Sequence, residues 1–581
     1  MARQSAYFPL KKQLEDFPVS IAAFDFETEG LGGKLLCASW YIDGMISPEI
    51  ILGEPDEIID GIIEVFIKAG KKVRWYAHNI QYDARYIVDT LIERYENTLQ
   101  FLMRSDTDVF VIKCHLFELV DSYAVFPQSL KTFSAAFDPE YGKMDIDDIT
   151  QFDVTNPAHL EYAKRDAYTL VRSLKNYDRT IYQIFGVHIA YTVASTAVKA
   201  WRSTIEANYF KPDRIDAFVR TAYFGGLVAL SSNKTFENVF TYDINSSYPY
   251  TMREFGVPYG TYAQTYYVEP DLPGVYRVLV ETPDELIFPI LPKRIKKGKS
   301  DYIVWAQGIF ETTVTNIELD FAVKNGYKIL KVYEGIVWQE KVYPFGDFVD
   351  ICERTRAKHK GTPFELVAKL MQNSVYGKFG SRTQRTELFI PKSDSDYEGA
   401  MPWGSSDKLW IRDTEVLSIQ SLPQWAVFIT AQARLNLLEK IYELGVENVI
   451  YCDTDSITTT KAMAKEHIGS AYGKFKLEKT WRTFRAIAPK VYVGELDTGK
   501  MLGAIKGIPK RKLTQADYLE LMKAGNIAVD MSILPSFKSF VKGDRETKTM
   551  RRRSTNILNS ATWQLIGDSI SPIILSEGES K

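Results

Sequence analysis

Three apolar runs of the sequence contain or end in acidic residues. Each run has the length and the β-branched and aromatic content of a buried strand. They are residues 21–27, with Asp25 and Glu27, residues 238–243, with Asp243, and residues 449–455, with Asp453 and Asp455. Alternate residues of a strand project to the same face, so we expect each closely spaced pair of carboxylates to point together.

Two like charges at a buried strand are costly unless a cation neutralises them. A hard divalent ion such as Mg²⁺ prefers carboxylate oxygens and keeps coordination positions open for water and phosphate. The pattern therefore predicts two acidic metal sites, and two exposed charges on a hairpin are the alternative interpretation.

Polar residues at helical spacing accompany these strands. Residues 369–377 predict a helix that carries Lys369, Asn373 and Tyr376 on one face. The Asn-Ser-Ser sequence at 245–247, directly after Asp243, is typical of a turn and helix N-cap that would point backbone N–H groups at an anion. Each pattern alone is weak, but their combination in one chain favours a metal-dependent site for a phosphorylated substrate.

Length and charge narrow the class of protein. A chain of 581 residues is long enough for three to five domains. The net charge of −3 argues against a general nucleic-acid binder, because phosphate binding depends on Lys and Arg. Basic clusters at 293–299, 510–512 and 548–553 nevertheless raise the expectation of a polyanionic partner, although each alone would more often be a solvated face.

The cysteines and the hydropathy pattern indicate a compartment. The four cysteines are far apart and form no CxxC pair, so we expect neither a disulfide framework nor a zinc site, and a reducing interior. There is no signal-like N-terminal segment and no apolar run of 18 residues. We therefore expect a cytoplasmic protein, in a host cell if phage-encoded, without a membrane span.

Five motifs resemble those of one enzyme family. DINSSYP at 243–249 resembles motif A, KLMQNSVYG at 369–377 motif B and YCDTDS at 451–456 motif C of the family B DNA polymerases. KVY at 490–492 is similar to their KxY motif and YFGG at 223–226 to their YxGG motif. The order and length resemble in particular the protein-primed branch of small linear-genome phages, with Ser247 departing from the usual Leu of motif A.

This resemblance implies roles for the residues of the motifs. Asp243 and Asp455 would hold two Mg²⁺ ions, or Mn²⁺, with Asp453 in support. Tyr248 would lie beneath the incoming sugar and exclude a 2′-hydroxyl. The expected nucleotide-binding residues are Ile244, Tyr248, Lys369, Asn373 and Tyr376. The expected contacts of duplex DNA are Tyr223, Gly225, Gly226, Gly377, Lys490 and Tyr492. Which of Arg354, Arg356, Lys358 and Lys360 joins Lys369 at the triphosphate is left open.

The N-terminal third resembles a second enzyme class, the DEDD proofreading exonucleases of the tyrosine subtype. Segments 21–28, 78–83 and 162–166 are similar to the motifs ExoI, ExoII and ExoIII. The resemblance implies that Asp25, Glu27, Asp83 and Asp166 hold two metal ions, that Tyr162 orients the attacking water, and that Lys143 lies near the scissile phosphate. The expected grip on the frayed 3′ end consists of Thr28, Asn79, Tyr82, Tyr86 and Ser122.

The expected fold is an α/β and α+β multidomain chain: an RNase H-like exonuclease domain and a right-hand palm, fingers and thumb with two branch-specific insertions. The predicted boundaries are exonuclease 1–188, palm 189–290 and 424–535, first insertion 291–345, fingers 346–381, second insertion 382–423, and thumb 536–581. The family implies that the first insertion contacts a terminal protein and that the second supports processivity and strand displacement. The basic residues expected in the thumb are Lys542, Arg545, Lys548 and Arg551 to Arg553.

The function expected from all of this is DNA-directed DNA synthesis with 3′–5′ proofreading by a monomer that binds primer-template DNA, dNTPs and a terminal protein. One alternative is a polymerase of the same branch that starts without a protein primer. Another is a DNA-binding relic that has lost catalysis, although every expected carboxylate is present. A reverse-transcriptase-like enzyme would have adjacent aspartates in place of Asp453-Thr454-Asp455.

Overall fold

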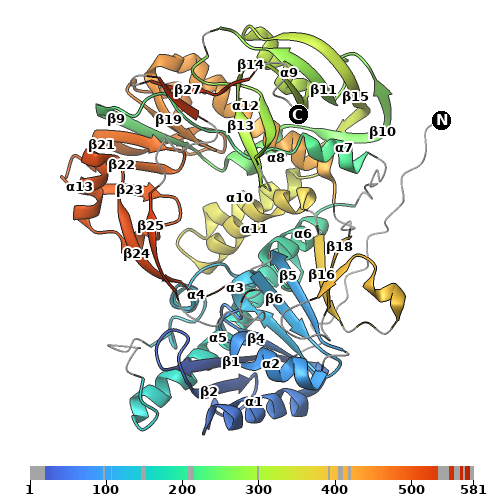
Figure 1. Ribbon diagram of the computed structural model, residues 1–581, viewed down its shortest axis with the longest axis vertical. Coiled ribbons are helices and arrows are strands. Elements are labelled where there is room, and N and C mark those ends of the chain that lie inside the picture. Colours follow the sequence, from blue (N-terminus) through green and yellow to red (C-terminus); the bar gives the residue numbers. More distant parts are fainter. Residues whose placement is uncertain are drawn as a thin grey trace.

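The computed structural model describes most of the chain. The described residues are 20–95, 98–105, 108–144, 152–206, 209, 215–284, 286–297, 300–381, 383–389, 391, 393–402, 410–416, 421–533, 535, 539, 548–554, 563–566 and 569–575. An N-terminal α/β unit lies at one end of the molecule, a pair of helices lies in the middle, and two further sheets lie at the other end (Figure 1). None of the described helices is both long and apolar enough to cross a bilayer.

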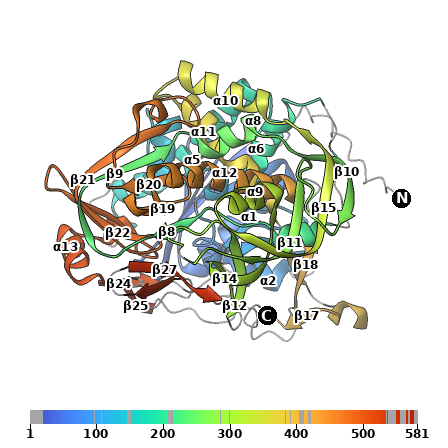
Figure 2. The same cartoon turned by 90° about the horizontal axis from the view of Figure 1, so that it is seen from above.

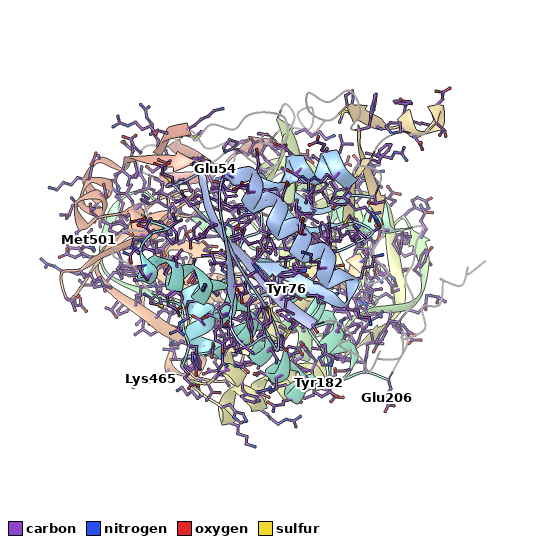
Figure 3. All side chains as sticks on the ribbon, turned by 90° about the horizontal axis from the view of Figure 1, so that it is seen from below. Glu54, Tyr76, Tyr182, Glu206, Lys465 and Met501 are labelled. Carbon is purple, nitrogen blue, oxygen red and sulfur yellow. The ribbon has the colours of Figure 1, made fainter. Side chains whose placement is uncertain are left out.

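The N-terminal unit is built on a seven-stranded sheet with the order β3-β2-β1-β4-β7-β6-β5. Its strands are β1 (Ser20–Thr28), β2 (Leu35–Ile42), β3 (Glu49–Leu52), β4 (Val73–Ala77), β5 (Gln100–Ser105), β6 (Asp108–Lys113) and β7 (Glu118–Asp121). β1 pairs antiparallel with β2 and parallel with β4, which places Asp25 and Glu27 on a central strand. When the molecule is viewed with the N-terminal unit in front, the fully buried Tyr76 of β4 lies near the middle of this unit, and Glu54 lies at the start of α1 (Figure 3).

Helices cover both faces of this sheet. They are α1 (Pro55–Ala69), α2 (Ala84–Tyr95), α3 (Ser122–Val125), α4 (Leu130–Phe137) and α5 (Pro157–Phe185). The long α5 starts where the Asn156 side chain accepts from Ala158 N and Pro157 supplies the helical φ, and it ends at Gly186 in the left-handed region. α5 contacts β1 and β2, so it brings Tyr162 and Asp166 to the acidic strand.

The second large sheet has the order β23-β22-β21-β9-β20-β19-β8. Its strands are β8 (Val228–Leu230), β9 (Thr235–Ile244), β19 (Val449–Asp453), β20 (Ser456–Thr459), β21 (Phe475–Ala488), β22 (Val491–Leu496) and β23 (Met501–Ile505). Helix α12 (Pro423–Leu444) contacts β20, and α13 (Gln515–Ala524) contacts β22 and β23 (Figure 2). Helices α7 (Asp216–Thr221) and α8 (Ser247–Glu254) pack against α12. Two of the apolar acidic runs therefore become neighbours in one sheet although they are some 200 residues apart in sequence.

A helix pair lies between this sheet and the N-terminal unit (Figure 1). It consists of α10 (Gly346–Lys358) and α11 (Pro363–Gly380), and α6 (Val193–Arg202) packs against α11. The predicted helix at 369–377 is confirmed as the inner part of α11. Its apolar residues Met371 and Val375 belong to the same core as Trp425 of α12, which anchors the pair.

A third sheet has the order β10-β15-β11-β14-β28. Its strands are β10 (Val257–Thr265), β11 (Gly274–Glu281), β14 (Gln307–Thr315), β15 (Lys328–Val342) and β28 (Ile574–Leu575); the hairpin β12 (Pro292–Lys297) with β13 (Ser300–Trp305) and the helix α9 (Asn316–Lys324) adjoin it. The expected boundary at 290/291 separates β10 and β11 from their partners β14 and β15. β28, expected in the thumb, also pairs with β14.

The remaining strands lie in two smaller groups. Between α11 and α12, β16 (Thr383–Phe389), β17 (Ala400–Pro402) and β18 (Trp410–Val416) form a three-stranded antiparallel sheet beside β5. Near the C-terminus, β24 (Ala528–Ile533) pairs with β25 (Lys548–Arg553), and β26 (Trp563–Ile566) with β27 (Ser569–Pro572). The hairpin of β24 and the basic strand β25 thus begins before residue 536, the predicted start of the thumb. Lys542 and Arg545 lie outside the described residues.

Candidate active sites

Asp243, Asp453 and Asp455 converge at one edge of the second sheet. Asp243 lies near the end of β9, directly opposite Ser456 of β20, and Ile244 N donates to Asp455 O (2.8 Å). The expectation that Asp453 and Asp455 occupy one strand is wrong. β19 ends at Asp453 and a turn follows, with Thr454 at φ 65°. Both carboxylates nevertheless line the same cavity of about 420 Å³.

Gly226 explains this close arrangement. Thr454 N donates to Leu227 O (2.8 Å), so the turn lies against the YxGG segment. A Cβ on Gly226 would come within 2.8 Å of the Thr454 side chain. Gly226 therefore permits the approach of the aspartate turn, whereas a Cβ on Gly225 would meet no atom within 4 Å.

The carboxylates of this site repel one another. Burial, together with the Asp455 charge, raises the pKa of Asp243 to about 7. Burial and the Asp453 charge raise the pKa of Asp455 to about 6. Glu478 of β21, which the sequence did not single out, adds its charge to both effects. Carboxylates with pKa values raised in this way fit a hard divalent cation, because the ion would replace the proton that they otherwise retain.

Asp453 differs from the other two because it has its own cation. Lys490 Nζ donates to both oxygens of Asp453 (2.7 and 2.9 Å), and Tyr451 OH donates to Oδ2 (3.2 Å). Lys490, expected at DNA, thus pairs with the aspartate turn, and Tyr492 lines the same cavity. The pairing leaves Asp243 and Asp455 as the carboxylates that lack a lysine partner among the described residues.

The turn after Asp243 forms an anion-binding arrangement. Ser246 has φ 49° and precedes α8, and the Ser247 hydroxyl is buried without a partner among the described residues. Arg356 Nη1 donates to Ser246 Oγ (2.9 Å), which singles out this residue among the four basic candidates of α10 and the following loop. Lys369 is exposed and lines a separate cavity of about 810 Å³ between α11 and helices α4 and α5.

Three tyrosines lie together near this turn. The rings of Tyr248 and Tyr376 stack with centroids 4.1 Å apart and 5° between their planes. Burial first, and then the neighbouring Tyr248, raises the pKa of the partly buried Tyr223. A Cβ on Gly380 would come within 2.6 Å of the Tyr223 ring, so Tyr223 packs on the end of α11. Asn373 is exposed on α11, and a Cβ on Gly377 would meet open space.

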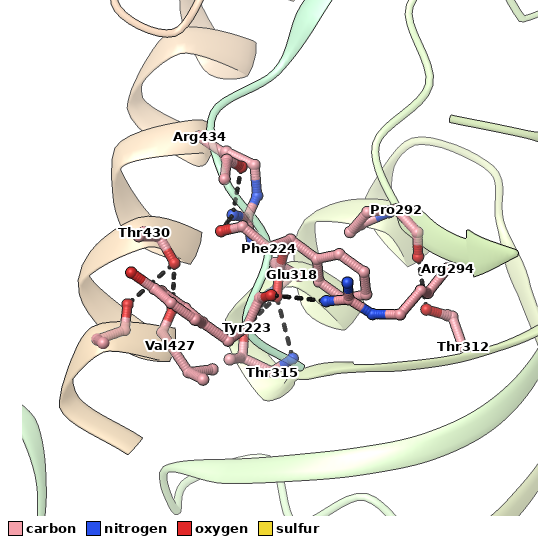
Figure 4. A network of polar contacts seen from close by, with 12 residues as sticks. Tyr223, Phe224, Pro292, Arg294, Thr312, Thr315, Glu318, Val427, Thr430 and Arg434 are labelled. Carbon is pink, nitrogen blue, oxygen red and sulfur yellow. Dashed lines mark hydrogen bonds and ion pairs between the residues drawn. The ribbon is translucent and has the colours of Figure 1, made fainter. Parts of the chain in front are cut away.

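Two arginines hold the YxGG segment from opposite sides (Figure 4). Arg434 of α12 donates to Phe224 O (2.8 Å) and Gly225 O (2.9 Å) and forms a buried ion pair with Glu318 of α9 (2.6 Å). Arg294 of β12 donates to Tyr223 O (3.0 Å), and its guanidinium lies 5.3 Å from the Phe224 ring centre. The segment between the N-terminal unit and the second sheet is thereby tied to the third sheet and its hairpin.

The N-terminal unit contains the second acidic site. Ligand oxygens of Asp25, Glu27 and Asp166 lie within 4.8 Å of one another. Asp83 adjoins them: its Oδ1 accepts from Phe26 N (3.2 Å), and burial with the Asp25 charge raises its pKa. Burial first, and then the Asp166 charge, raises the pKa of Asp25 to about 7; burial and Asp25 raise that of Glu27 to about 9. This oxygen-only donor set also fits divalent cations.

Lys143 and Tyr162 flank this site. Lys143 Nζ forms an ion pair with Asp166 Oδ2 and lies 4.8 Å from the centre of the Tyr162 ring. Asp166 Oδ1 is buried without a hydrogen-bond partner among the described residues. A lysine that the sequence alone could have left in solvent is therefore part of the acidic cluster.

Thr28, Tyr82 and Tyr86 contact one another at the end of the acidic strand β1. Thr28 Oγ1 and Tyr82 OH share a hydrogen bond (2.5 Å), and the Tyr82 and Tyr86 rings meet edge to face at 5.9 Å. Asn79 adopts φ 69°, and its backbone N donates to Asp121 Oδ1 (3.0 Å), which makes Asp121 a supporting residue that sequence reasoning missed.

Ser122, expected to grip the frayed 3′ end, makes internal hydrogen bonds. It is fully buried, its hydroxyl donates to Ala77 O (3.1 Å), and the same oxygen lies 3.0 Å from His78 Nδ1. Burial lowers the pKa of His78 to about 4, so this imidazole is neutral. Ser122 thus supports His78, and its expected contact with a strand end stays a prediction.

One known protein family matches most of the chain. The family model for DNA polymerase type B, organellar and viral, matches residues 67–157 and 144–473. These matches cover well over half of the chain, which therefore belongs to the family of type B DNA polymerases, organellar and viral.

Particular relatives are phage and fungal proteins. The DNA polymerase of Bacillus phage Nf is 26% identical over 504 residues, covering 78% of this chain and 82% of the relative. The DNA-directed DNA polymerase of Enterobacteria phage PRD1 is 27% identical over 492 residues, covering 81% and 82%. A probable DNA polymerase of Neurospora intermedia is 27% identical over 385 residues; this chain spans 39% of its length.

The fold matches Phi29 DNA polymerase, solved in complex with primer-template DNA and incoming nucleotide substrates. The TM-score is 0.73 at 18% identity, with 93% of this chain and 100% of that chain covered. The expected mixed α/β multidomain fold is thereby confirmed.

Proposed function

We propose that the protein is a DNA-directed DNA polymerase that adds dNTPs to a primer 3′-hydroxyl on a template and removes mismatched 3′ ends with its N-terminal unit. The observation that carries the proposal is the proximity of Asp243 and Asp455 beside the Ser246–Ser247 turn: Ile244 N donates to Asp455 O (2.8 Å), and the Asp455 charge contributes to the raised pKa of Asp243. Carboxylates for divalent ions and backbone N–H groups for phosphate are the two requirements of phosphoryl transfer.

Asp243 and Asp455 would hold two Mg²⁺ ions, or Mn²⁺, and Asp453 would support them through Lys490. When bound, the ions lower the pKa of the primer hydroxyl and neutralise the leaving pyrophosphate. The chain itself orients the substrate. The N-terminus of α8 and Arg356 bind the triphosphate, and Lys369 is available to join them. Lys490 holds Asp453 in place through hydrogen bonds to both of its oxygens.

Tyr248 would select the sugar. Its ring is fixed by the parallel stack on Tyr376, so it cannot move aside easily for a 2′-hydroxyl. Ile244 and Asn373 would complete the nucleotide site, while Tyr223, Gly225, Gly226, Gly377 and Tyr492 would contact the primer-template duplex.

In the N-terminal unit, Asp25, Glu27, Asp83 and Asp166 would hold the metal ions of a 3′–5′ exonuclease. Tyr162 would orient the attacking water, and Lys143, already paired with Asp166, would meet the scissile phosphate. Thr28, Tyr82 and Tyr86 would bind the frayed strand, with Asn79 and His78 shaping the loop beside it.

The test is extension of a primed single-stranded circle with Mg²⁺, with and without dNTPs. We expect full-length product with dNTPs and shortening of the primer without them. Asp455→Asn should abolish extension and keep the shortening, whereas Asp25→Ala with Asp83→Ala should do the reverse. Binding of DNA without either reaction would contradict the proposal.

We further propose that synthesis starts on a terminal protein and displaces the non-template strand, in the cytoplasm of a host cell and by a monomer. Support comes from two sheets outside the palm and fingers: the third sheet with its β12–β13 hairpin, and the β16–β18 sheet beside β5. The division into an exonuclease, palm, fingers, thumb and two insertions is part of this proposal, with the first insertion extended back to β10. A full-length, strand-displaced product covalently linked to a co-purified protein would support it, and strict dependence on an annealed primer would contradict it.

A further inference from the structure

The loop between β20 and β21 is attached to the motif A turn. Asn245 holds it at three points: its backbone N donates to Lys474 O (2.9 Å), its carbonyl accepts from Gly473 N (2.9 Å), and its Nδ2 donates to Gly469 O (2.7 Å). Gly473 has φ 81°, and a Cβ there would come within 2.6 Å of the Tyr250 ring. The loop is therefore fixed in one conformation against motif A.

Tyr472 of this loop contacts both fingers helices through one hydroxyl. The hydroxyl accepts from Arg356 Nη1 of α10 (2.8 Å) and donates to Gln372 Oε1 of α11 (2.9 Å). Gln372 is fully buried, so its amide has no access to solvent for a replacement partner. Because the same Arg356 Nη1 also donates to Ser246 Oγ (2.9 Å), Tyr472 and Ser246 together place the guanidinium over the turn.

Arg356 differs in its electrostatics from the neighbouring Arg253. Arg253 of α8 has carboxylate partners, with Nε 2.7 Å from Glu254 and Nη1 paired with Glu353 of α10. Within the described part of the chain, no carboxylate oxygen lies within 4.0 Å of the Arg356 guanidinium, and its Nε is buried without a hydrogen-bond partner. A cation that is held only by neutral oxygens at a helix N-terminus keeps its charge available for an anion.

We infer that Tyr472 is a positioning residue for the incoming nucleotide: it holds Arg356 and Gln372 so that the two fingers helices present a cation to the triphosphate above the N-terminus of α8. The inference rests on the proposed function, because the anion is the triphosphate of a dNTP. Tyr472 then acts on the phosphates, which all four dNTPs share, and its effect is independent of the base and of the sugar selection by Tyr248.

The experiment is steady-state insertion of each single dNTP by the full chain at saturating primer-template DNA. We expect Tyr472→Phe to raise the KM for all four dNTPs about tenfold, the ratio that loss of one hydrogen bond to a charged group gives. We expect kcat to change less than about twofold and the discrimination against ribonucleotides to stay the same. A general packing defect would instead lower kcat, DNA affinity and the unfolding temperature together.

Tyr250→Phe is the matched control. Tyr250 lies on α8 beside Gly473, and its hydroxyl forms no hydrogen bond within the described residues, so its removal should leave KM unchanged. A second variant, Arg356→Met, tests the route of the effect. If Tyr472 acts through Arg356, adding Tyr472→Phe to Arg356→Met should change KM less than about twofold.

Two results would overturn the inference alone: an active wild type with an unchanged KM in Tyr472→Phe, or a full tenfold effect of Tyr472→Phe in the Arg356→Met background. A wild-type enzyme that extends no primer would overturn the proposed function, and the inference with it. The two failures are therefore distinguishable in one series of measurements.

Discussion

Arg434→Met removes the cation from the buried ion pair that ties the YxGG segment to the third sheet. Arg434 and Glu318 are each 1% exposed. The guanidinium also donates to the carbonyls of Phe224 and Gly225, and Glu318 Oε2 accepts from Thr315 N and Oγ1 as the capping box of α9. Four further polar groups thus depend on one pair of opposite charges.

The size of the effect follows from what each substitution leaves behind. Removing one member of a buried ion pair costs about 3–5 kcal/mol, because the partner's charge stays in a poorly solvated place. With two carbonyls also losing donors, we expect Arg434→Met to lower the free energy of unfolding by about 5 kcal/mol. Glu318→Leu strands the guanidinium and removes the helix cap, which also costs about 5 kcal/mol.

The double variant separates this account from simple loss of contacts. It contains no buried charge, so only the cap and the two carbonyls are lost, about 3 kcal/mol in place of the sum of about 10 kcal/mol. Urea unfolding followed by tryptophan fluorescence measures the three values. Arg277→Met is the control, since its pairs with Glu311 and Glu334 are between 34% and 41% exposed and contribute about 0–1 kcal/mol. Additive losses in the double variant would refute the reasoning.

Three further predictions concern the two sites. In EDTA the unfolding temperature should fall as pH rises from about 5 toward 9. The reason is that Asp25 and Glu27, with pKa values of about 7 and 9 in the folded state, keep protons there that they have already released in the unfolded state. Mn²⁺ should restore the unfolding temperature most at high pH, and a flat curve in EDTA, measured by scanning fluorimetry, would contradict this prediction. Lys143→Met should slow 3′ degradation about 100-fold, with primer extension retained, because a positive charge beside Asp166 is lost; equal loss of both rates would contradict it. Tyr248→Val should weaken the discrimination against ribonucleotides by about 10- to 200-fold in single-nucleotide insertion, and unchanged discrimination would remove Tyr248 from the sugar site.

Much of both sites could be predicted from short stretches of sequence. An apolar run before Asp243, a helix through Lys369 and Tyr376, and an Asn-Ser-Ser turn are decided by residues within a few positions of one another. Strand, helix and cap preferences depend on these near neighbours, so the chain order of the motifs already indicated carboxylates near a phosphate site.

Other features depend on partners far away in sequence. Asp453 and Asp455 are divided by a hairpin turn because Leu227 and Gly226 pack against Thr454, and neither is visible in the run 449–455. Similarly, Ser122 became a buried support because the loop after β4 lies on it.

The amino-acid sequence by itself determined which strands and helices form and which chemical groups they carry, because hydrophobic period and turn chemistry act over a few residues. Only the tertiary structure decided which cation meets which anion: Lys490 with Asp453, Lys143 with Asp166, and Arg356 with no carboxylate at all in the described part of the chain. The physical reason is that Coulomb energy and desolvation depend on distance and burial in space, and chain folding sets both through contacts between residues that are remote in sequence.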